Sequence, residues 1–135
     1  MKIVIDSNIL FSALTKDSKT RRIILEYEGL FLFPQYIFEE MEKHIELLLK
    51  KSRLSKQEFN TLLTILLKKV VVVPNGILLP FRKQALEIVK EIDKDDVLFI
   101  ACALAYPESI IWSNDKKLKK QKSVKVLNTE EILRI

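Results

Sequence analysis

Five short apolar segments alternate along the chain with longer segments that have helical periodicity. The short segments are almost continuous in β-branched or aromatic residues, as expected for strands that are covered on both faces of a parallel sheet. In the longer segments apolar residues return every three or four positions, which predicts amphipathic helices. The predicted strands are residues 3–5, 30–33, 70–73, 110–113 and 124–127. The predicted helices are residues 21–27, 36–51, 55–69, 82–92, 96–106 and 129–133.

This alternation predicts the α/β fold class. Right-handed crossovers between parallel strands place helices on both faces of the sheet, which gives a three-layer α/β/α sandwich with a five-stranded parallel sheet. Ser55 followed by Glu58 fits a capping box that opens one helix, and Pro107 fits the end of another. The chain has 135 residues, with only 2 glycines and 4 prolines and no visible linker. We therefore expect a single domain over residues 1–135.

Composition excludes several classes of protein. Cys102 is the only cysteine and lies in an apolar run, so the chain cannot form an internal disulfide, and we expect this side chain to fill the core. The longest apolar run, residues 97–106, is far shorter than the roughly 20 residues that span a bilayer. Asp6 interrupts the first apolar segment, which does not fit a secretory signal. We expect a cytoplasmic protein with no membrane partner.

Two carboxylates follow predicted strands directly. Asp6 comes after residues 3–5, and Asp115 comes shortly after residues 110–113. An ionised acid beside an apolar core must be hydrogen-bonded, paired or bound to a metal. Sites in open parallel sheets lie beyond the carboxyl ends of the strands, where successive connections leave in opposite directions. If the two strands are neighbours at that point, both carboxylates face one crevice.

Further acids precede the apolar helix that begins near residue 96. Asp93, Asp95 and Asp96 lie where the dipole of that helix favours anions. Acids in a first turn commonly serve as N-caps or dipole partners, and we assign that structural role to Asp93 and Asp95. Asp96 is our candidate for the site.

The predicted helix 36–51 offers several glutamates. Glu40 and Glu42 flank its apolar stripe, whereas Glu39 and Glu46 point away from it. Periodicity therefore leaves Glu40 and Glu42 as two equal candidates. His44, the only histidine, is expected on the surface of this helix without a catalytic role.

Basic residues are concentrated behind Asp115. The net charge is +5 and the pI is near 9.3, which is weak support for a polyanionic partner. Five lysines form a basic flank next to the acids, or alternatively the solvated face of an amphipathic helix around Leu118. These lysines are Lys116, Lys117, Lys119, Lys120 and Lys122.

Four segments together resemble the PIN domain. They are Ile-Asp-Ser-Asn-Ile-Leu at residues 5–10, Glu-Met at 40–41, the run at 93–104 that begins Asp-Lys-Asp-Asp, and Trp-Ser-Asn-Asp-Lys at 112–116. The resemblance covers essentially the whole chain, in order, with a parallel-sheet pattern between the segments.

The resemblance implies a site and an activity. PIN domains are typically divalent-metal-dependent nucleases that act on RNA, and many small stand-alone ones are toxins of the VapC type. Such proteins commonly form homodimers and are often silenced by an antitoxin. The resemblance also selects Glu40 over Glu42. The implied acidic quartet is Asp6, Glu40, Asp96 and Asp115, with Asn8 and Ser113 as polar companions.

The residue types suit this chemistry. Four carboxylates without histidine or cysteine form an all-oxygen site, which favours Mg²⁺ or Mn²⁺ over zinc. A bound metal lowers the pKa of its water, so no histidine base is required. No further acid lies close behind Asp115, which leaves the number of metal ions open. We expect an endoribonuclease that holds flanking phosphates of RNA through Lys116, Lys117, Lys119 and Lys120.

Two alternative functions remain open. One is a catalytically weak or inactive PIN-fold module that binds RNA or regulates a partner. The other is a Mg²⁺-dependent small-molecule phosphohydrolase that resembles the haloacid dehalogenases, but that family would want a second aspartate where this chain has Asn8. An apolar helix face could serve as a dimer interface or belong to the core. Its residues are Leu62, Leu63, Leu66 and Leu67.

Overall fold

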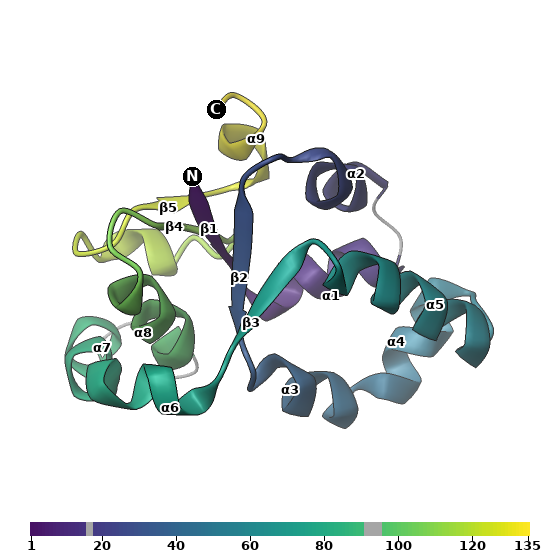
Figure 1. The fold of residues 1–135 in the computed structure, drawn as a ribbon, viewed down its shortest axis with the longest axis horizontal. Helices are drawn as coiled ribbons and strands as arrows, with labels where there is room; N and C mark the ends of the chain where they lie inside the picture. The colour runs from purple at the N-terminus through teal and green to yellow at the C-terminus, as the bar shows by residue number, and fades with distance from the viewer. Residues whose placement is uncertain (16–17, 91–95) are drawn as a thin grey trace.

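The computed structural model describes residues 1–15, 18–90 and 96–135, and a five-stranded parallel sheet forms its centre (Figure 1). The order of the strands is β3-β2-β1-β4-β5, with every pair parallel. All five predicted strands are confirmed, although the last begins two residues later than expected. The strands are β1 (Lys2–Ile5), β2 (Leu30–Pro34), β3 (Val70–Val73), β4 (Ile110–Trp112) and β5 (Val126–Leu127).

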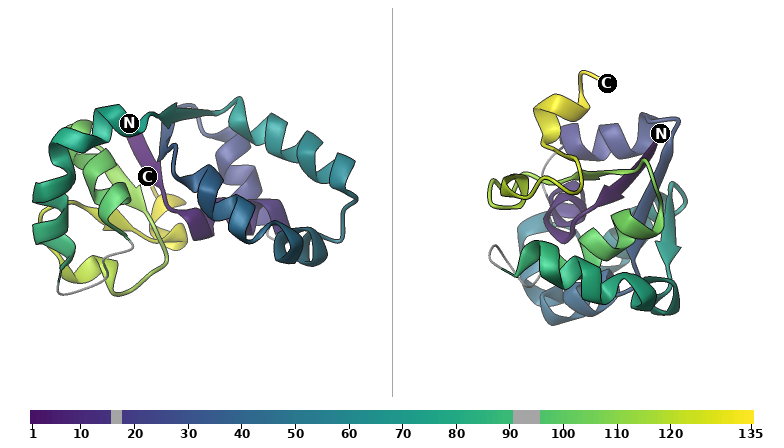
Figure 2. Two further views of the ribbon diagram at one scale, coloured as in Figure 1. Left: turned by 90° about the horizontal axis from the view of Figure 1, so that it is seen from below. Right: turned by 90° about the vertical axis from the view of Figure 1, so that its left-hand side faces the viewer.

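Helices cover both faces of the sheet. Helices α1 to α5 lie on one face and α6 to α8 on the other, as Figures 1 and 2 both show, so the predicted three-layer sandwich is confirmed. The α-helices are α1 (Ser7–Thr15), α2 (Ser18–Glu26), α3 (Ile37–Lys43), α4 (Ile45–Ser52), α5 (Lys56–Leu67), α6 (Asn75–Leu78), α7 (Arg82–Val89), α8 (Val97–Ala105) and α9 (Thr129–Ile132). Two short 3₁₀ helices are η1 (Leu79–Phe81) and η3 (Leu118–Lys120).

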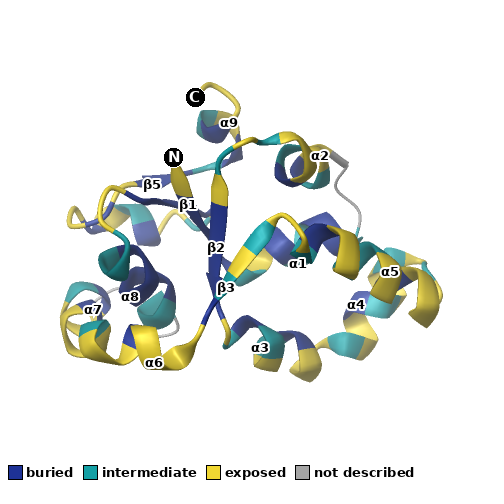
Figure 3. Cartoon of the chain, in the orientation of Figure 1, coloured by how far each residue is buried: buried dark blue, intermediate teal, exposed yellow. Residues whose placement is uncertain are grey.

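The sheet divides the core into two halves. In β1, Ile3 and Ile5 pack toward α1 to α5, while Val4 packs toward α6 to α8. Successive side chains of a strand point to opposite faces, so a strand in the middle layer must be apolar at every position. Figure 3 shows the result, with β1, β2 and β4 mostly buried between helices whose outer faces are exposed, and the edge strand β3 only partly covered.

The prediction of a single helix over residues 36–51 is wrong. The chain forms α3 and α4 instead, and the break lies at His44. The His44 N–H donates to the Met41 carbonyl at 3.1 Å, so its hydrogen bond spans three residues rather than the four of an α-helix. The two parts of the predicted helix are consequently free to follow different directions past the sheet.

The helix ends show which local signals are reliable. The capping box at Ser55 is present, with reciprocal hydrogen bonds to Glu58 of 3.1 and 3.0 Å. Helix α8 ends before Pro107, as predicted. Helices α1 and α6 were not predicted. Helix α1 follows β1 without a loop, because the Asp6 carboxylate accepts the Ile9 N–H at 2.9 Å and so caps the new helix.

Several further expectations concern burial. Cys102 is buried, as expected for a core residue, and desolvation raises the pKa of its thiol to about 12. The four leucines of the α5 face pack with the core rather than forming a free surface, since Leu66 is fully buried and the other three are partly buried against it. In the described parts of the chain, every helix is too short or too polar to cross a membrane.

Candidate active site

The site lies at the topological switch point of the sheet, where the chain leaves one side of β1 and begins to add strands on the other. Strands β2 and β3 extend the sheet on one side of β1, and β4 and β5 extend it on the other. Ile5 pairs with Trp112, and the Asp6 N–H donates to the Trp112 carbonyl at 3.4 Å. The ends of β1 and β4 are therefore neighbours, which is the condition under which Asp6 and Asp115 were predicted to face one crevice.

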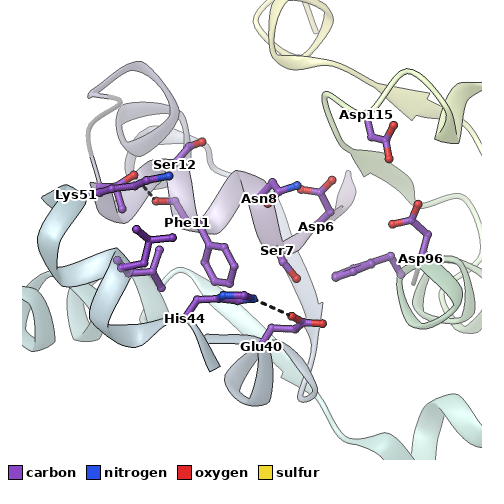
Figure 4. Close-up of a pocket in the computed structure, with 14 residues that line it drawn as sticks. Asp6, Ser7, Asn8, Phe11, Ser12, Glu40, His44, Lys51, Asp96 and Asp115 are labelled. Carbon is purple, nitrogen blue, oxygen red and sulfur yellow. Dashed lines mark hydrogen bonds and ion pairs between the residues drawn. The ribbon is translucent and has the colours of Figure 1, made fainter. Parts of the chain in front are cut away.

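All four acids of the predicted quartet line one pocket of about 570 Å³. Figure 4 shows the carboxylates of Asp6, Asp96 and Asp115 directed toward a shared space, with Glu40 on the opposite side of that space. The four residues follow β1, belong to α3, precede α8 and follow β4, respectively. The fold thus gathers carboxylates from four remote segments of the chain.

Asp6 is the most buried of these acids, with 5% of its surface exposed. Its carboxylate accepts hydrogen bonds from the Ile9 N–H, the Ser113 hydroxyl and the Asn8 N–H. Burial raises the pKa of Asp6, the negative charge of Asp115 adds to the increase, and the hydrogen bonds oppose it. A cation between Asp6 and Asp115 would relieve both the desolvation and the repulsion.

Ser113 connects the two strand-end acids. Its hydroxyl donates to Asp6 and accepts the Asp115 N–H at 3.1 Å. The Asp115 carboxylate in turn accepts the Lys117 N–H at 2.9 Å. Both carboxylates are therefore oriented by groups on the loop that follows β4, and Ser113 lies beside Asp6, where a polar companion was predicted.

Asp96 occupies the N-cap position of α8, but its side chain makes no capping hydrogen bond to that helix. Its carboxylate points into the pocket instead (Figure 4). Asp96 thus does not play the ordinary structural role of an acid at this position. Asp93 and Asp95 lie outside the described residues.

Glu40 lines the pocket from α3, whereas Glu42 lies on the exposed side of the same helix. The Tyr36 hydroxyl donates to the Glu40 carboxylate, which raises the pKa of Tyr36, and the His44 imidazole lies 3.9 Å from the other side of that carboxylate. His44 is exposed, as expected, but its place in the pocket beside Glu40 was not anticipated.

Helix α1 supplies pocket residues that were missed because the helix itself was missed. Asn8, a predicted polar companion of the acids, lines the pocket, and Ser7 and Phe11 join it from the same helix. The signal was present in the sequence, since Asp6 provides an N-cap and buried residues follow at helical spacing. Those buried residues are Ile9, Leu10, Ala13 and Leu14.

The lysines behind Asp115 do not form an amphipathic helix. The segment folds as the single turn η3, in which Leu118 is buried. Lys119 is half-buried and donates to Glu131, so its ammonium group is already neutralised within the fold. The remaining lysines of this group are exposed: Lys116, Lys117, Lys120 and Lys122.

The donor set fits a hard divalent cation. Across residues 1–15, 18–90 and 96–135, the acids, histidine and cysteine do not form a cluster of three that is tight enough to be a ready-made metal site. Mg²⁺ does not need one, because it commonly binds through one or two carboxylates and keeps several waters. The carboxylates of the pocket and the raised pKa of Asp6 both fit such a cation.

Acids at neighbouring strand ends of an α/β/α sandwich lie where open parallel sheets bind their ligands. The sequence profile described as PIN domain matches residues 4–134, and the chain belongs to this family. PIN domains are generally nucleases.

The fold is also similar to a solved structure. This is the crystal structure of VapBC2 from Rickettsia felis bound to a DNA fragment from their promoter, with a TM-score of 0.70 at 14% sequence identity. The alignment covers 95% of this chain and 98% of that chain. No curated protein matches the sequence.

Proposed function

We propose that the protein is a divalent-metal-dependent endoribonuclease that hydrolyses phosphodiester bonds in RNA. The observation that carries this proposal is that four acids from separate segments line one pocket at the reversal of a parallel sheet. Family membership supports nuclease chemistry, and the choice of RNA rests on the resemblance to RNA-cleaving PIN domains. The proposed catalytic residues are Asp6, Glu40, Asp96 and Asp115.

Each acid has a distinct proposed role. Asp6 and Asp115, which are oriented through Ser113, would be the principal ligands of Mg²⁺ or Mn²⁺. Asp96 would be a further ligand, and Glu40 would contact the ion directly or through a water. When bound, such an ion lowers the pKa of an attacking water and polarises the phosphodiester. Ser113 and the Asn8 N–H keep the Asp6 carboxylate in place throughout.

The exposed lysines next to Asp115 would hold phosphates of the RNA. Lys116, Lys117 and Lys120 are exposed to solvent, where contacts with phosphate cost little desolvation. Lys119 can take part only after its bond to Glu131 opens. We therefore assign it a smaller share of binding than its neighbours.

We further propose that the protein is the toxin of a toxin–antitoxin pair, silenced by an antitoxin protein and active as a homodimer. The similarity to the VapBC2 structure, which contains a two-component complex, supports the antitoxin partner. Light scattering would test the homodimer. Co-expression with a small adjoining reading frame, followed by co-purification, would test the antitoxin.

An RNA-cleavage assay tests the proposed activity. We expect purified protein to cleave single-stranded RNA with Mn²⁺ or Mg²⁺ and to lose this activity in a chelator. Asp6→Asn and Asp115→Asn should each remove most of the activity while the protein stays folded. Cleavage without metal, or full activity in either variant, contradicts the proposal. RNA binding without cleavage favours a regulatory module, and hydrolysis of a small phosphate monoester alone favours a phosphohydrolase.

A further inference from the structure

The pocket that holds the acids continues well beyond them. It runs along the groove between α1 and the α3–α4 segment and reaches Lys51 near the end of α4. Figure 4 places Lys51 at the end of the pocket opposite Asp96 and Asp115. Lys51 lies 11 residues after Glu40 (51 − 40), on the second of the two helices. The pocket therefore extends past the acids along the α3–α4 segment.

The two sides of this groove come from the α3–α4 segment and from α1. On one side, Glu40 of α3, His44 at the break and Lys51 of α4 line the pocket together. On the other side, Phe11 faces the same space from α1 and is only partly buried. Leu47 of α4, which is half exposed, also lines the groove.

The chemical character therefore changes in order along the groove. Carboxylates lie at one end, the Phe11 ring lies between the ends, and the Lys51 side chain lies at the other end (Figure 4). Leu47, which also lines the pocket, adds apolar surface. A nucleotide has the matching order, because its base can lie against an aromatic or apolar surface while its phosphates need cations. A basic protein segment would suit the acids but would be repelled by Lys51.

We propose that this groove is a nucleotide subsite for the single-stranded RNA next to the scissile bond. The base or ribose lies against Phe11, and Lys51 binds the following phosphate. The inference rests on the proposed nuclease function, since the acids fix where the scissile phosphate lies. It adds a second phosphate contact on the side of the pocket away from Lys116 and Lys117.

The chain offers a matched control for Lys51. Lys50 is the adjacent residue of α4, is also exposed and lies outside the pocket. Lys50→Ala and Lys51→Ala remove the same charge from the same helix, so they have the same effect on net charge and helix dipole. Only loss of a specific phosphate contact distinguishes the two variants.

The experiment measures binding of a short fluorescein-labelled single-stranded RNA by anisotropy in the presence of chelator, so that the readout does not depend on cleavage. We expect Lys51→Ala to weaken binding roughly three- to tenfold and to reduce the salt slope of binding by about 0.7. Lys50→Ala should change neither value appreciably. In the metal-loaded enzyme, Lys51→Ala should raise KM and leave kcat nearly unchanged.

A second pair of variants tests the middle of the groove. Phe11→Leu keeps an apolar side chain but removes the ring, and we expect roughly fivefold weaker binding. Phe11→Tyr keeps the ring and should restore binding. Thermal melts of both variants show whether the fold is retained.

The outcomes separate this inference from the proposed function. If wild-type protein cleaves RNA while Lys51→Ala behaves like Lys50→Ala and Phe11→Leu binds normally, the subsite is wrong and the nuclease assignment stands. That result would favour a protein segment, rather than RNA, as the ligand of the groove. If wild-type protein neither binds nor cleaves RNA with Mn²⁺, both proposals fail.

Discussion

The two walls of the pocket differ in how firmly they hold their acids. The sheet wall consists of Asp6 and Asp115, which Ser113 connects from behind the pocket, and the helix wall consists of Glu40, His44 and Lys51. On the sheet wall each carboxylate accepts a backbone N–H at 2.9 Å, and Ser113 bonds to both acids.

The helix wall is held more loosely. The contacts of Glu40 with Tyr36 and His44 come from the same short segment of chain, and the His44 and Glu40 side chains remain 52% and 28% exposed. The difference suggests that the sheet wall is prearranged for the ion, whereas the helix wall can adjust to the substrate. Substitutions on the sheet wall should then have the larger effects on catalysis.

The largest expected effect is on the sheet wall. Asp6→Asn and Asp115→Asn should each lower kcat about 1,000-fold or more, because each removes a charge that the metal requires. Cleavage rates at saturating Mn²⁺ provide the measurement, and circular dichroism checks that the fold is intact. A loss of less than tenfold in both variants would remove the sheet wall from the catalytic centre.

A smaller effect is expected at Glu40. Glu40→Gln should lower kcat roughly ten- to a hundredfold, since a water-mediated or outer contact contributes less than a principal ligand. Glu42→Gln is the control on the exposed side of α3 and should retain wild-type kcat. If Glu40→Gln were as damaging as Asp6→Asn, the proposed difference between the two walls would be wrong.

The lysines on the flank should affect binding rather than turnover. Lys116→Ala and Lys120→Ala should each reduce the salt slope of RNA binding by about 0.7. Lys119→Ala should reduce it less, because its ammonium is bonded to Glu131. Affinity measured over a series of salt concentrations tests this, and equal slopes for all three variants would show that the ion pair opens in the complex.

Asp6 also has a structural role that can be separated from catalysis. Both Asp6→Asn and Asp6→Ala remove the charge, but asparagine can still cap α1 through its side-chain oxygen. Metal-free Asp6→Ala should therefore be about 1 kcal/mol less stable than Asp6→Asn, a difference of about 3–4 °C in Tm. Identical melting temperatures would mean that the cap contributes nothing.

The smallest expected effect concerns the ion pair on the flank. The bond from Lys119 lowers the pKa of Glu131, so the pair stabilises the fold above the ordinary glutamate pKa and loses this contribution as pH falls through the lowered value. Glu131→Gln keeps a capping partner for Asn128 but removes the pair. Its Tm should be slightly below that of wild type at neutral pH and should converge with it once the pH falls below the lowered pKa of Glu131. A constant difference would assign the effect to the cap.

The strands could be predicted because buried parallel strands are apolar at every position, as in residues 110–112. That Asp6 and Asp115 face the same pocket could be predicted only on the condition that β1 and β4 are neighbouring strands, which the sequence does not show. Glu40 and Glu42 were equivalent by periodicity. Their difference arises from the direction in which α3 passes the sheet, which is a tertiary property.

Other features had no local signal. The break at His44 follows from a shift to a shorter backbone hydrogen bond, without a glycine or proline to mark it. The pairing of Lys119 with Glu131 joins η3 to α9 and cannot be seen in the charge pattern alone. Helix α1 was missed for a different reason, because Asp6 was considered only as a functional acid and not also as an N-cap.

The central claim is that carboxylates from remote segments share one divalent ion. The most direct measurement is an anomalous difference map from crystals of the protein grown with Mn²⁺. We predict a peak between the carboxylates of Asp6, Asp96 and Asp115 that is absent from Asp6→Asn crystals. Mn²⁺ bound elsewhere, or a pocket without Mn²⁺ at a saturating concentration, would contradict it.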